Sequence, residues 1–151
     1  MEETCFICNK HAGIIKTDGV AIYEDEFVYV GHIDNNGKQG YLGHLMIDLK
    51  RHVPTLGDMT LNEAKAFGVI TARVSKALME SEDAEHIYSL VSGNSVPHLH
   101  MHVVPRYPGT PKRYWGPMSV HEWAAAPSGG EVETAELCLR IKSYLETHDH
   151  E

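Results

Sequence analysis

The chain has 151 residues, which is enough for one domain with a sizeable core and too few to expect two. Its ordinary composition, without a long apolar run or a signal peptide, argues against a membrane-spanning or secreted protein and favours a cytoplasmic one. The formal net charge of −8 argues against duplex nucleic acid or an anionic membrane as the main partner, because both favour a basic surface. A nucleotide is not excluded, since its phosphates need only a local group of hydrogen-bond donors. We therefore expect a single domain over residues 1–151.

The first motif is a Cys-x-x-Cys pair formed by Cys5 and Cys8. Such a pair is typical of either half a zinc site or a redox-active dithiol. A redox dithiol needs a following helix within a βαβ unit, and residues 9–19 show no such pattern. Zinc needs two further ligands from elsewhere in the chain, so a metal site and an unmetallated pair both remain as interpretations. The third cysteine, Cys138, lies in a helical pattern and is interpreted as a small buried apolar residue.

Three short apolar runs in the first half of the chain predict β-strands. Residues 20–33 contain two of these runs, separated by an acidic turn at residues 24–26. Residues 35–37 have turn chemistry, because the glycine at the end of this segment can adopt positive φ. The third run, residues 41–49, contains His44, which the pattern alone describes as a half-buried strand histidine.

Two helices are predicted, each with an apolar stripe at helical spacing. The first begins at Thr60, which can form a capping box with Glu63. Its stripe consists of Leu61, Ala64, Phe67, Thr71, Val74 and Leu78. The second helix begins within residues 128–131 and ends near Thr147. Its stripe consists of Ala135, Cys138, Ile141 and Leu145, and both stripes are interpreted as core.

The most unusual stretch is residues 98–104, where three histidines alternate with apolar residues. These histidines, His98, His100 and His102, are called the triad below. Successive side chains of a strand point to opposite faces, so the triad is expected to share one face while the apolar residues face a core. Pro97 and Pro105 are expected at the strand ends, because proline cannot donate to an interior ladder.

The triad has two chemical interpretations. Neutral imidazole is a common metal ligand, so the triad could bind a metal ion. Alternatively, one imidazole attacks an electrophile while its neighbours orient it and stabilise the developing charge. A third interpretation is an exposed histidine-rich face without a function, which the strict alternation disfavours. A predicted strand at residues 86–91 and a turn at residues 92–95 precede the triad and bring the turn close to it.

Residues 98–104 resemble the signature of the histidine triad (HIT) proteins, in which histidines alternate with apolar residues and a further apolar residue follows. The resemblance also covers residues 41–47, 51–52, 93–96 and 105–106. The matching core runs over about residues 5–107, and residues 108–147 form a C-terminal tail and helix. This coverage makes the resemblance specific.

The strand runs, with one helix between them and another after them, predict an α+β fold. We expect an antiparallel sheet of about five strands with two main helices, and the resemblance implies that this is the HIT-like fold. It also implies a homodimer and a nucleotide as the substrate. In a branch of the family an N-terminal cysteine pair binds a structural zinc with two histidines. The matching ligands here are Cys5, Cys8, His52 and His98.

The resemblance implies a catalytic role for each member of the triad. His100 matches the family nucleophile, and its other ring nitrogen must hold a proton that an acceptor fixes, for which we expect a backbone carbonyl. His102 is expected to donate to the non-bridging phosphate oxygens, and His98 to orient the site. A zinc ligand cannot also shuttle a proton, so with zinc bound His98 only supports His100. His44 is implied as an additional active-site histidine.

Three residues are implied in substrate binding. Ser95 matches a serine that contacts the phosphate or the leaving group, Asn94 matches a glutamine, and Asp34 is the candidate for the ribose-binding acid. Arg106 could pair either with a phosphate or with a surface carboxylate.

The implied activity is hydrolysis or transfer of a nucleotidyl group. It acts at the α-phosphate of a nucleoside phosphoramidate or a dinucleoside polyphosphate, through a covalent nucleotidyl-histidine and without a catalytic metal. Two alternatives stay open. One is a nucleotide-binding or regulatory module with little catalysis, and the other is a metal-dependent hydrolase in which the triad binds the ion.

Overall fold

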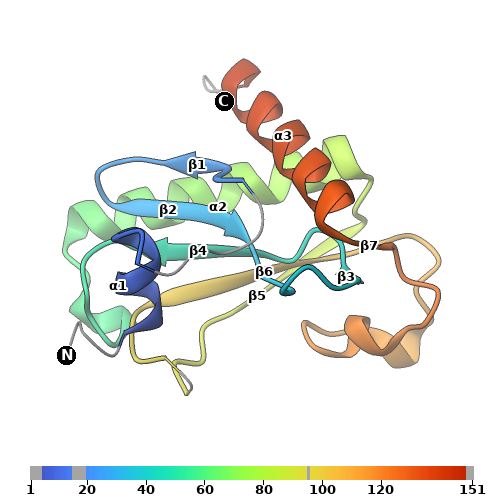
Figure 1. The fold of residues 1–151 in the computed structure, drawn as a ribbon, viewed down its shortest axis with the longest axis horizontal. Coiled ribbons are helices and arrows are strands. Elements are labelled where there is room, and N and C mark those ends of the chain that lie inside the picture. The colour runs from blue at the N-terminus through green and yellow to red at the C-terminus, as the bar shows by residue number, and fades with distance from the viewer. Residues whose placement is uncertain (1–4, 15–19, 95, 149–151) are drawn as a thin grey trace.

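The computed structural model describes residues 5–14, 20–94 and 96–148, and its centre is a five-stranded antiparallel sheet (Figure 1). The strands are β1 (Tyr23–Glu24), β2 (Val28–His32), β4 (Leu45–Leu49), β5 (His86–Leu90) and β6 (His100–Arg106). Their order is β1-β2-β4-β6-β5, so β6 lies between β4 and β5. A separate pair joins β3 (Gly40–Tyr41) to β7 (Ser128–Gly129). The predicted α+β fold with about five antiparallel strands is confirmed.

The two main helices are also confirmed, as α2 (Leu61–Glu82) and α3 (Glu131–Thr147). α2 packs against one face of the sheet (Figure 1). The strand residues of that core include Val28, Val30, Leu45, Ile47, Leu49 and Val103, and Leu99 joins them just before β6. The capping box at Thr60 forms as predicted, because Glu63 donates its N–H to the Thr60 hydroxyl over 3.1 Å and its carboxylate accepts the Thr60 N–H over 2.8 Å.

The first turn of α2 differs from the predicted stripe. The buried apolar residues of this helix are Phe67, Ile70, Val74, Ala77 and Leu78. Leu61 and Ala64, which the sequence places in the same stripe, are exposed instead. The buried residue of the first turn is Glu63, and the Arg51 guanidinium donates to its two carboxylate oxygens over 2.8 and 2.9 Å. An ion pair therefore covers this turn where the sequence predicted apolar packing.

The triad strand begins two residues later than predicted. β6 starts at His100, so His98 lies just before it, and β6 includes Pro105, which the sequence placed at its end. Pro105 pairs with Ile87 of β5, whereas the pairing of β4 with β6 ends at Val103. β6 has no β4 neighbour at Pro105, so the missing N–H leaves no hydrogen bond toward β4 unmade.

The run predicted as one strand over residues 41–49 is split in two. β3 ends at Tyr41, Gly43 has a φ of +94°, and β4 starts at Leu45. A Cβ atom at Gly43 would lie 2.8 Å from Pro105 Cγ, so this position requires glycine both for its backbone conformation and for the close approach. His44 therefore follows a tight turn and is not a strand residue.

A third helix, α1 (Phe6–His11), was not predicted. It has six residues, of which Ile7 alone is buried, and such a short helix carries no periodic signal. It contains the second cysteine of the Cys-x-x-Cys pair, and Cys5 caps it by accepting the Cys8 N–H over 3.3 Å. α1 lies in front of the sheet in Figure 1, whereas α2 lies behind it. The sequence showed no helix of a βαβ unit after the cysteine pair, and no βαβ unit occurs in the described residues, although the short helix α1 itself was not expected.

α3 has the bounds that the sequence predicted for it. Its buried residues include Leu137, Cys138, Ile141 and Leu145, which pack toward α2 and β2. Cys138 is a buried apolar residue, as predicted, whereas Ala135 is only half-buried. None of the helices that the structure describes is long and apolar enough to cross a bilayer.

Candidate functional site

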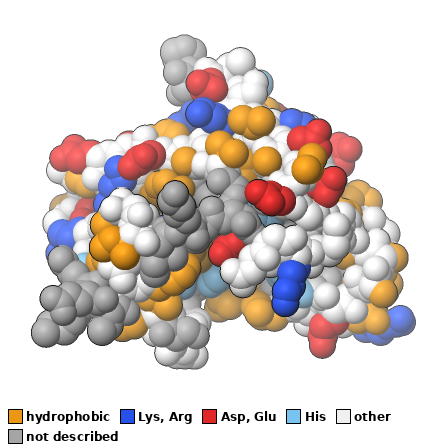
Figure 2. All heavy atoms as spheres, viewed as in Figure 1, with side chains coloured by type: hydrophobic (Ala, Val, Ile, Leu, Met, Phe, Trp, Pro, Cys, Tyr) orange, Lys and Arg blue, Asp and Glu red, His pale blue; other side chains and the backbone are white. Residues whose placement is uncertain are grey.

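His100 and His102 lie on the face of the sheet opposite α2, because they alternate with Met101 and Val103, which pack in the core. On β4 their directly opposite neighbours are Asp48 and Met46, respectively. Histidine side chains are visible near the middle of the face shown in Figure 2. His100 Nδ1 donates a 2.7 Å hydrogen bond to the backbone carbonyl of His98, so its proton is held there and the lone pair of Nε2 is left free. The expected backbone acceptor is thus present.

His102 begins a chain of three imidazoles. Its Nδ1 lies 2.9 Å from Nε2 of His44, and Nδ1 of His44 lies 2.9 Å from Nε2 of His121. The rings of His100 and His102 stand edge to face with their centroids 5.2 Å apart. His44 is only 4% exposed, and burial followed by the proximity of His102 and His121 lowers the pKa of His44 to about 3. The chain of imidazoles is therefore neutral at its centre near pH 7.

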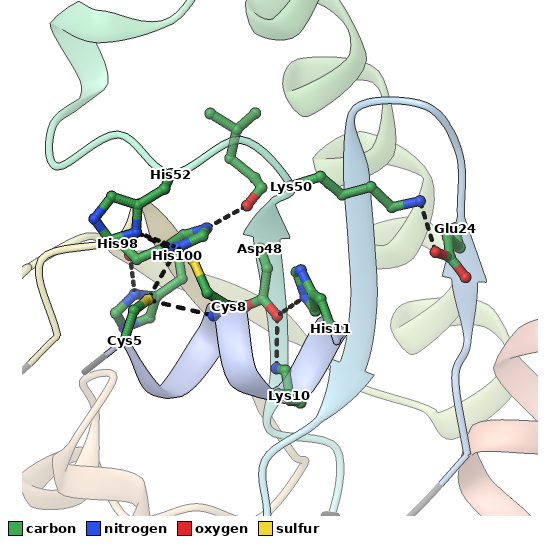
Figure 3. Close-up of polar contacts among 11 residues, drawn as sticks. Cys5, Cys8, Lys10, His11, Glu24, Asp48, Lys50, His52, His98 and His100 are labelled. Carbon is green, nitrogen blue, oxygen red and sulfur yellow. Dashed lines mark hydrogen bonds and ion pairs between the residues drawn. The ribbon is translucent and has the colours of Figure 1, made fainter. Parts of the chain in front are cut away.

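His98 has different partners from the rest of the triad. Its Nδ1 lies 3.2 Å from Cys5 Sγ, 3.4 Å from Cys8 Sγ and 3.2 Å from Nδ1 of His52 (Figure 3). Cys8 Sγ in turn lies 3.2 Å from Nδ1 of His52. The four ligand atoms all lie within 4.8 Å of one another. His98 Nε2 donates a 2.6 Å hydrogen bond to the carbonyl of Leu49, so Nδ1 is the nitrogen left for a metal.

The spacing of this cluster fits tetrahedral zinc. Zn–S bonds of about 2.3 Å and Zn–N bonds of about 2.0–2.1 Å place neighbouring ligand atoms of a tetrahedron about 3.3–3.8 Å apart. The nitrogen and sulfur atoms here approach to 3.2–3.4 Å. Two thiolates and two imidazoles form a ligand set that is typical of structural zinc, and four protein ligands leave no open position for a substrate.

α1 also brings two basic side chains to the triad face (Figure 3). Lys10 Nζ lies 2.6 Å and His11 Nε2 lies 3.0 Å from the same oxygen, Oδ2 of Asp48. The Asp48 side chain is 0% exposed, and its other oxygen has no hydrogen-bond partner in the described part of the chain. The Tyr29 ring, on β2 directly opposite Asp48, contacts His11 with the ring centroids 5.0 Å apart. A buried carboxylate beside His100 is thus balanced by α1.

Two of the three predicted substrate-binding residues, Asn94 and Asp34, lie in loops. Ser95 lies outside the described residues. Asn94 is exposed in the connection from β5 to β6, and its N–H donates to the Ser92 hydroxyl over 3.3 Å. Asp34 follows β2, and its Oδ1 accepts the Asn36 N–H over 3.1 Å. These are local turn bonds, so the substrate-binding roles of the three residues stay predictions.

Of the two partners that the sequence predicted for Arg106, a phosphate or a surface carboxylate, the structure shows a carboxylate. Its Nε donates to Glu85 over 2.9 Å, and an Nη donates to the Tyr88 hydroxyl over 2.7 Å. Its guanidinium also lies over the Trp115 ring, 3.7 Å from the centroid. Arg106 therefore ties the C-terminal tail to the end of β6.

Sequence reasoning missed several residues of the site, among them Asp48 and His121. Asp48 had a signal, because it is a charged residue within the apolar run of β4. His121 had none, because it lies in a short 3-10 helix (Ser119–Glu122) of a tail without periodicity. Both reach the site through contacts between distant parts of the chain.

Comparison with known proteins gives concordant matches. Residues 16–109 match the HIT domain family. Protein hit of Bacillus subtilis (strain 168) is 29% identical over 110 residues, which cover 70% of this chain and 72% of that protein. In fold, the chain is similar to a zinc-bound histidine triad family protein from Mycobacterium smegmatis, with a TM-score of 0.70, 19% identity and 99% of both chains covered. It is also similar to Plasmodium falciparum diadenosine triphosphate hydrolase in complex with cyclomarin A, with a TM-score of 0.60, 14% identity and 85% of this chain and 77% of that chain covered.

Proposed function

The chain belongs to the HIT domain family, and from that premise we propose that it is a nucleotide hydrolase or transferase of the histidine triad type. It acts at the α-phosphate of a nucleoside phosphoramidate or a dinucleoside polyphosphate. The observation that carries this proposal is the state of His100, whose Nδ1 proton is bound by the carbonyl of His98 and whose Nε2 keeps a free lone pair. Such a nitrogen is a nucleophile, and the backbone holds the ring in one tautomer.

The reaction has two displacement steps at phosphorus. His100 Nε2 attacks the α-phosphorus and a bond forms between them, while the bond to the leaving group breaks with its electron pair going to that group, and an amine leaving group takes up a proton from solvent. Water then attacks the same phosphorus, the P–N bond breaks, and His100 regains its lone pair as the nucleotide leaves and a proton is released. His102 donates from Nε2 to the non-bridging oxygens, where negative charge builds up in both steps. Ser95 contacts the leaving group, and Asn94 and Asp34 bind the substrate outside the reacting centre.

The same proposal assigns a structural zinc to the cysteine–histidine cluster. Cys5, Cys8, His52 and His98 hold it, and its chemistry is to fix their positions and so to fasten α1 to the sheet. His98 then serves His100 with its backbone carbonyl and not as a proton shuttle. This supports a hydrolase in which the triad itself does not bind a catalytic ion.

Trapping the covalent intermediate tests the proposal. We expect wild-type protein, mixed with a dinucleoside polyphosphate or a nucleoside phosphoramidate labelled at the α-phosphate and quenched in alkali, to retain label, because phosphorus bonded to imidazole nitrogen resists base. The His100→Asn variant should retain none and should turn over at least about a thousandfold more slowly. His86→Asn is the matched control, since His86 is an exposed histidine of β5 outside the site.

Two outcomes contradict the proposal. Turnover by folded His100→Asn at the wild-type rate would reject His100 as the nucleophile. Nucleotide binding measured by calorimetry, without product or trapped label for any substrate of the panel, would favour the nucleotide-binding module.

A homodimer is the assembly that we propose for this chain. Sedimentation should then give twice the mass of the 16.9 kDa chain.

A further inference from the structure

We propose that His121 is a positioning residue, which fixes the tautomer of His102 through His44 so that His102 presents an N–H to the substrate phosphate. The inference rests on the proposed function for its kinetic consequence, whereas the hydrogen-bonded chain itself exists without substrate. His121 lies in the 3-10 helix Ser119–Glu122 of the C-terminal tail, a segment to which the sequence assigned no chemistry.

The first support is geometric. His44 is buried between two histidines, with each of its ring nitrogens 2.9 Å from a nitrogen of one neighbour. The Tyr41 ring lies against the His121 ring, with centroids 4.9 Å apart, and thereby limits how that ring can turn. The outer end of the chain is exposed, because His121 itself reaches the surface. The chain therefore runs from solvent, through a buried imidazole, to the triad.

The second support is the hydrogen-bonding capacity of neutral imidazole, which has one N–H and one lone pair. A contact between two ring nitrogens needs one of each, so the proton positions in the chain are linked. Only two arrangements satisfy both contacts. In the first, His121 donates to His44, His44 donates to His102, and His102 keeps its Nε2–H for the substrate. In the second, every bond is reversed, and His102 presents a lone pair at Nε2.

Only the first arrangement assists the proposed reaction. A lone pair on His102 Nε2 would face the anionic oxygens of the phosphate and repel them, whereas an N–H stabilises the charge that develops on them. Burial lowers the pKa of His44, which keeps this residue neutral. A neutral His44 that accepts a hydrogen bond at one ring nitrogen must donate one at the other, so the direction of the first bond sets the direction of the second. His121 is needed at the far end because it supplies the N–H that lets His44 accept at Nδ1.

Three variants separate this role from a structural one. His121→Phe keeps a ring against Tyr41 but removes both nitrogens, and His121→Gln restores a side-chain N–H near the same place. His86→Phe is the control, because His86 is an exposed histidine of β5 that contacts Tyr88 and lies outside the chain. We expect His121→Phe to lower kcat roughly three- to tenfold with KM within about twofold, the effect of losing one hydrogen bond that acts in the transition state. His121→Gln should recover most of the loss, and His86→Phe should match wild type.

The decisive measurement is imidazole ¹⁵N NMR of the substrate-free protein, which reads each tautomer directly and needs no turnover. In wild type we expect His44 and His102 both to carry the proton on Nε2, and in His121→Phe we expect His44 to populate the other tautomer. A wild-type His44 protonated on Nδ1 overturns the proposal, and so does an unchanged kcat in His121→Phe. If wild type turns over none of the substrates, the proposed function fails while the NMR result still decides the inference.

Discussion

The ion pair between α1 and β4 allows a quantitative test of how α1 is held. Lys10 and Asp48 are 11% and 0% exposed, and Lys10 Nζ lies 2.6 Å from Asp48 Oδ2. Replacing Lys10 with methionine keeps the apolar stem of the side chain and removes its charge. The Asp48 carboxylate is then left buried, with His11 as its remaining basic partner on α1.

The expected loss of stability follows from that burial. Breaking a buried ion pair by removing one partner costs about 3–5 kcal/mol, because the remaining charge is desolvated without compensation. His11 still donates to Asp48, so we expect Lys10→Met to lie at the low end, about 3 kcal/mol. For a protein of this size that loss corresponds to a fall in Tm of roughly 6–12 °C.

Urea unfolding of four metal-loaded proteins measures the effect. They are wild type, Lys10→Met, Asp48→Asn and the double variant. The double variant should recover most of the loss, since a buried amide is far less costly than a buried unpaired carboxylate. Lys50→Met is the matched control, because Lys50 Nζ also lies 2.6 Å from a carboxylate, that of Glu24, but these side chains are 31% and 55% exposed (Figure 3). We expect that control to cost less than about 1 kcal/mol.

Equal losses for Lys10→Met and Lys50→Met would refute the reasoning, because burial would then make no difference. Additive losses in the double variant would refute it as well. In that case Lys10 and Asp48 would contribute separately and not as a pair.

Three further predictions follow from other parts of the structure. Removing zinc with a chelator should lower the free energy of unfolding by roughly 3 kcal/mol, measured by thermal unfolding, relative to protein in a zinc concentration several hundred times the Kd for zinc. Cys8→Ser should abolish zinc binding and Cys138→Ser should not, and zinc retained by Cys8→Ser would contradict the site. The free energy of unfolding should fall as the pH is lowered from 6.5 to about 3, because the pKa of His44 is lowered to about 3 in the folded protein and the unfolded chain therefore binds more protons below pH 6.5. His44 alone should account for a loss of about 2 kcal/mol at pH 5. Urea unfolding should show a smaller fall in His44→Gln, and equal falls in the two proteins would oppose this assignment. Gly43→Ala should destabilise by at least about 2 kcal/mol, since its backbone has positive φ and a Cβ would overlap Pro105, whereas Gly68→Ala in α2 meets nothing within 4 Å and should stabilise by up to about 1 kcal/mol in the same unfolding assay.

Sequence reasoning located the parts of the site that depend on local periodicity. The alternation of His100 and His102 with apolar residues has the period of a strand, and this is why their shared face could be predicted. The Thr60 capping box is also a local pattern, and it placed the start of α2 correctly. Packing is not local, so the sequence could not show that Leu61 is exposed and that Glu63 is buried in its place.

Contacts between distant segments account for what was missed. Asp48 is paired with Lys10 across 38 positions, and His44 meets His121 across 77. No periodic pattern connects such residues. The cysteine–histidine cluster spans similar distances, and its membership could be stated beforehand only because the resemblance to a family supplied the ligand set.

The placement of α1 and of the segment around His121 has a practical consequence for handling this protein. The two segments come from opposite flanks of the chain, yet both contact residues on the side of the sheet that carries His102. α1 contacts Asp48, and His121 contacts His44, which in turn contacts His102. Proteolytic loss of either flank would leave every strand of the five-stranded sheet in the remaining polypeptide. A sample that lacked only the N-terminal flank would lose the six helical residues of α1 and keep a nearly normal circular dichroism spectrum while its chemistry was impaired, whereas loss of the C-terminal flank would also remove α3. Intact mass should therefore be verified before any weak activity is taken as a property of the protein.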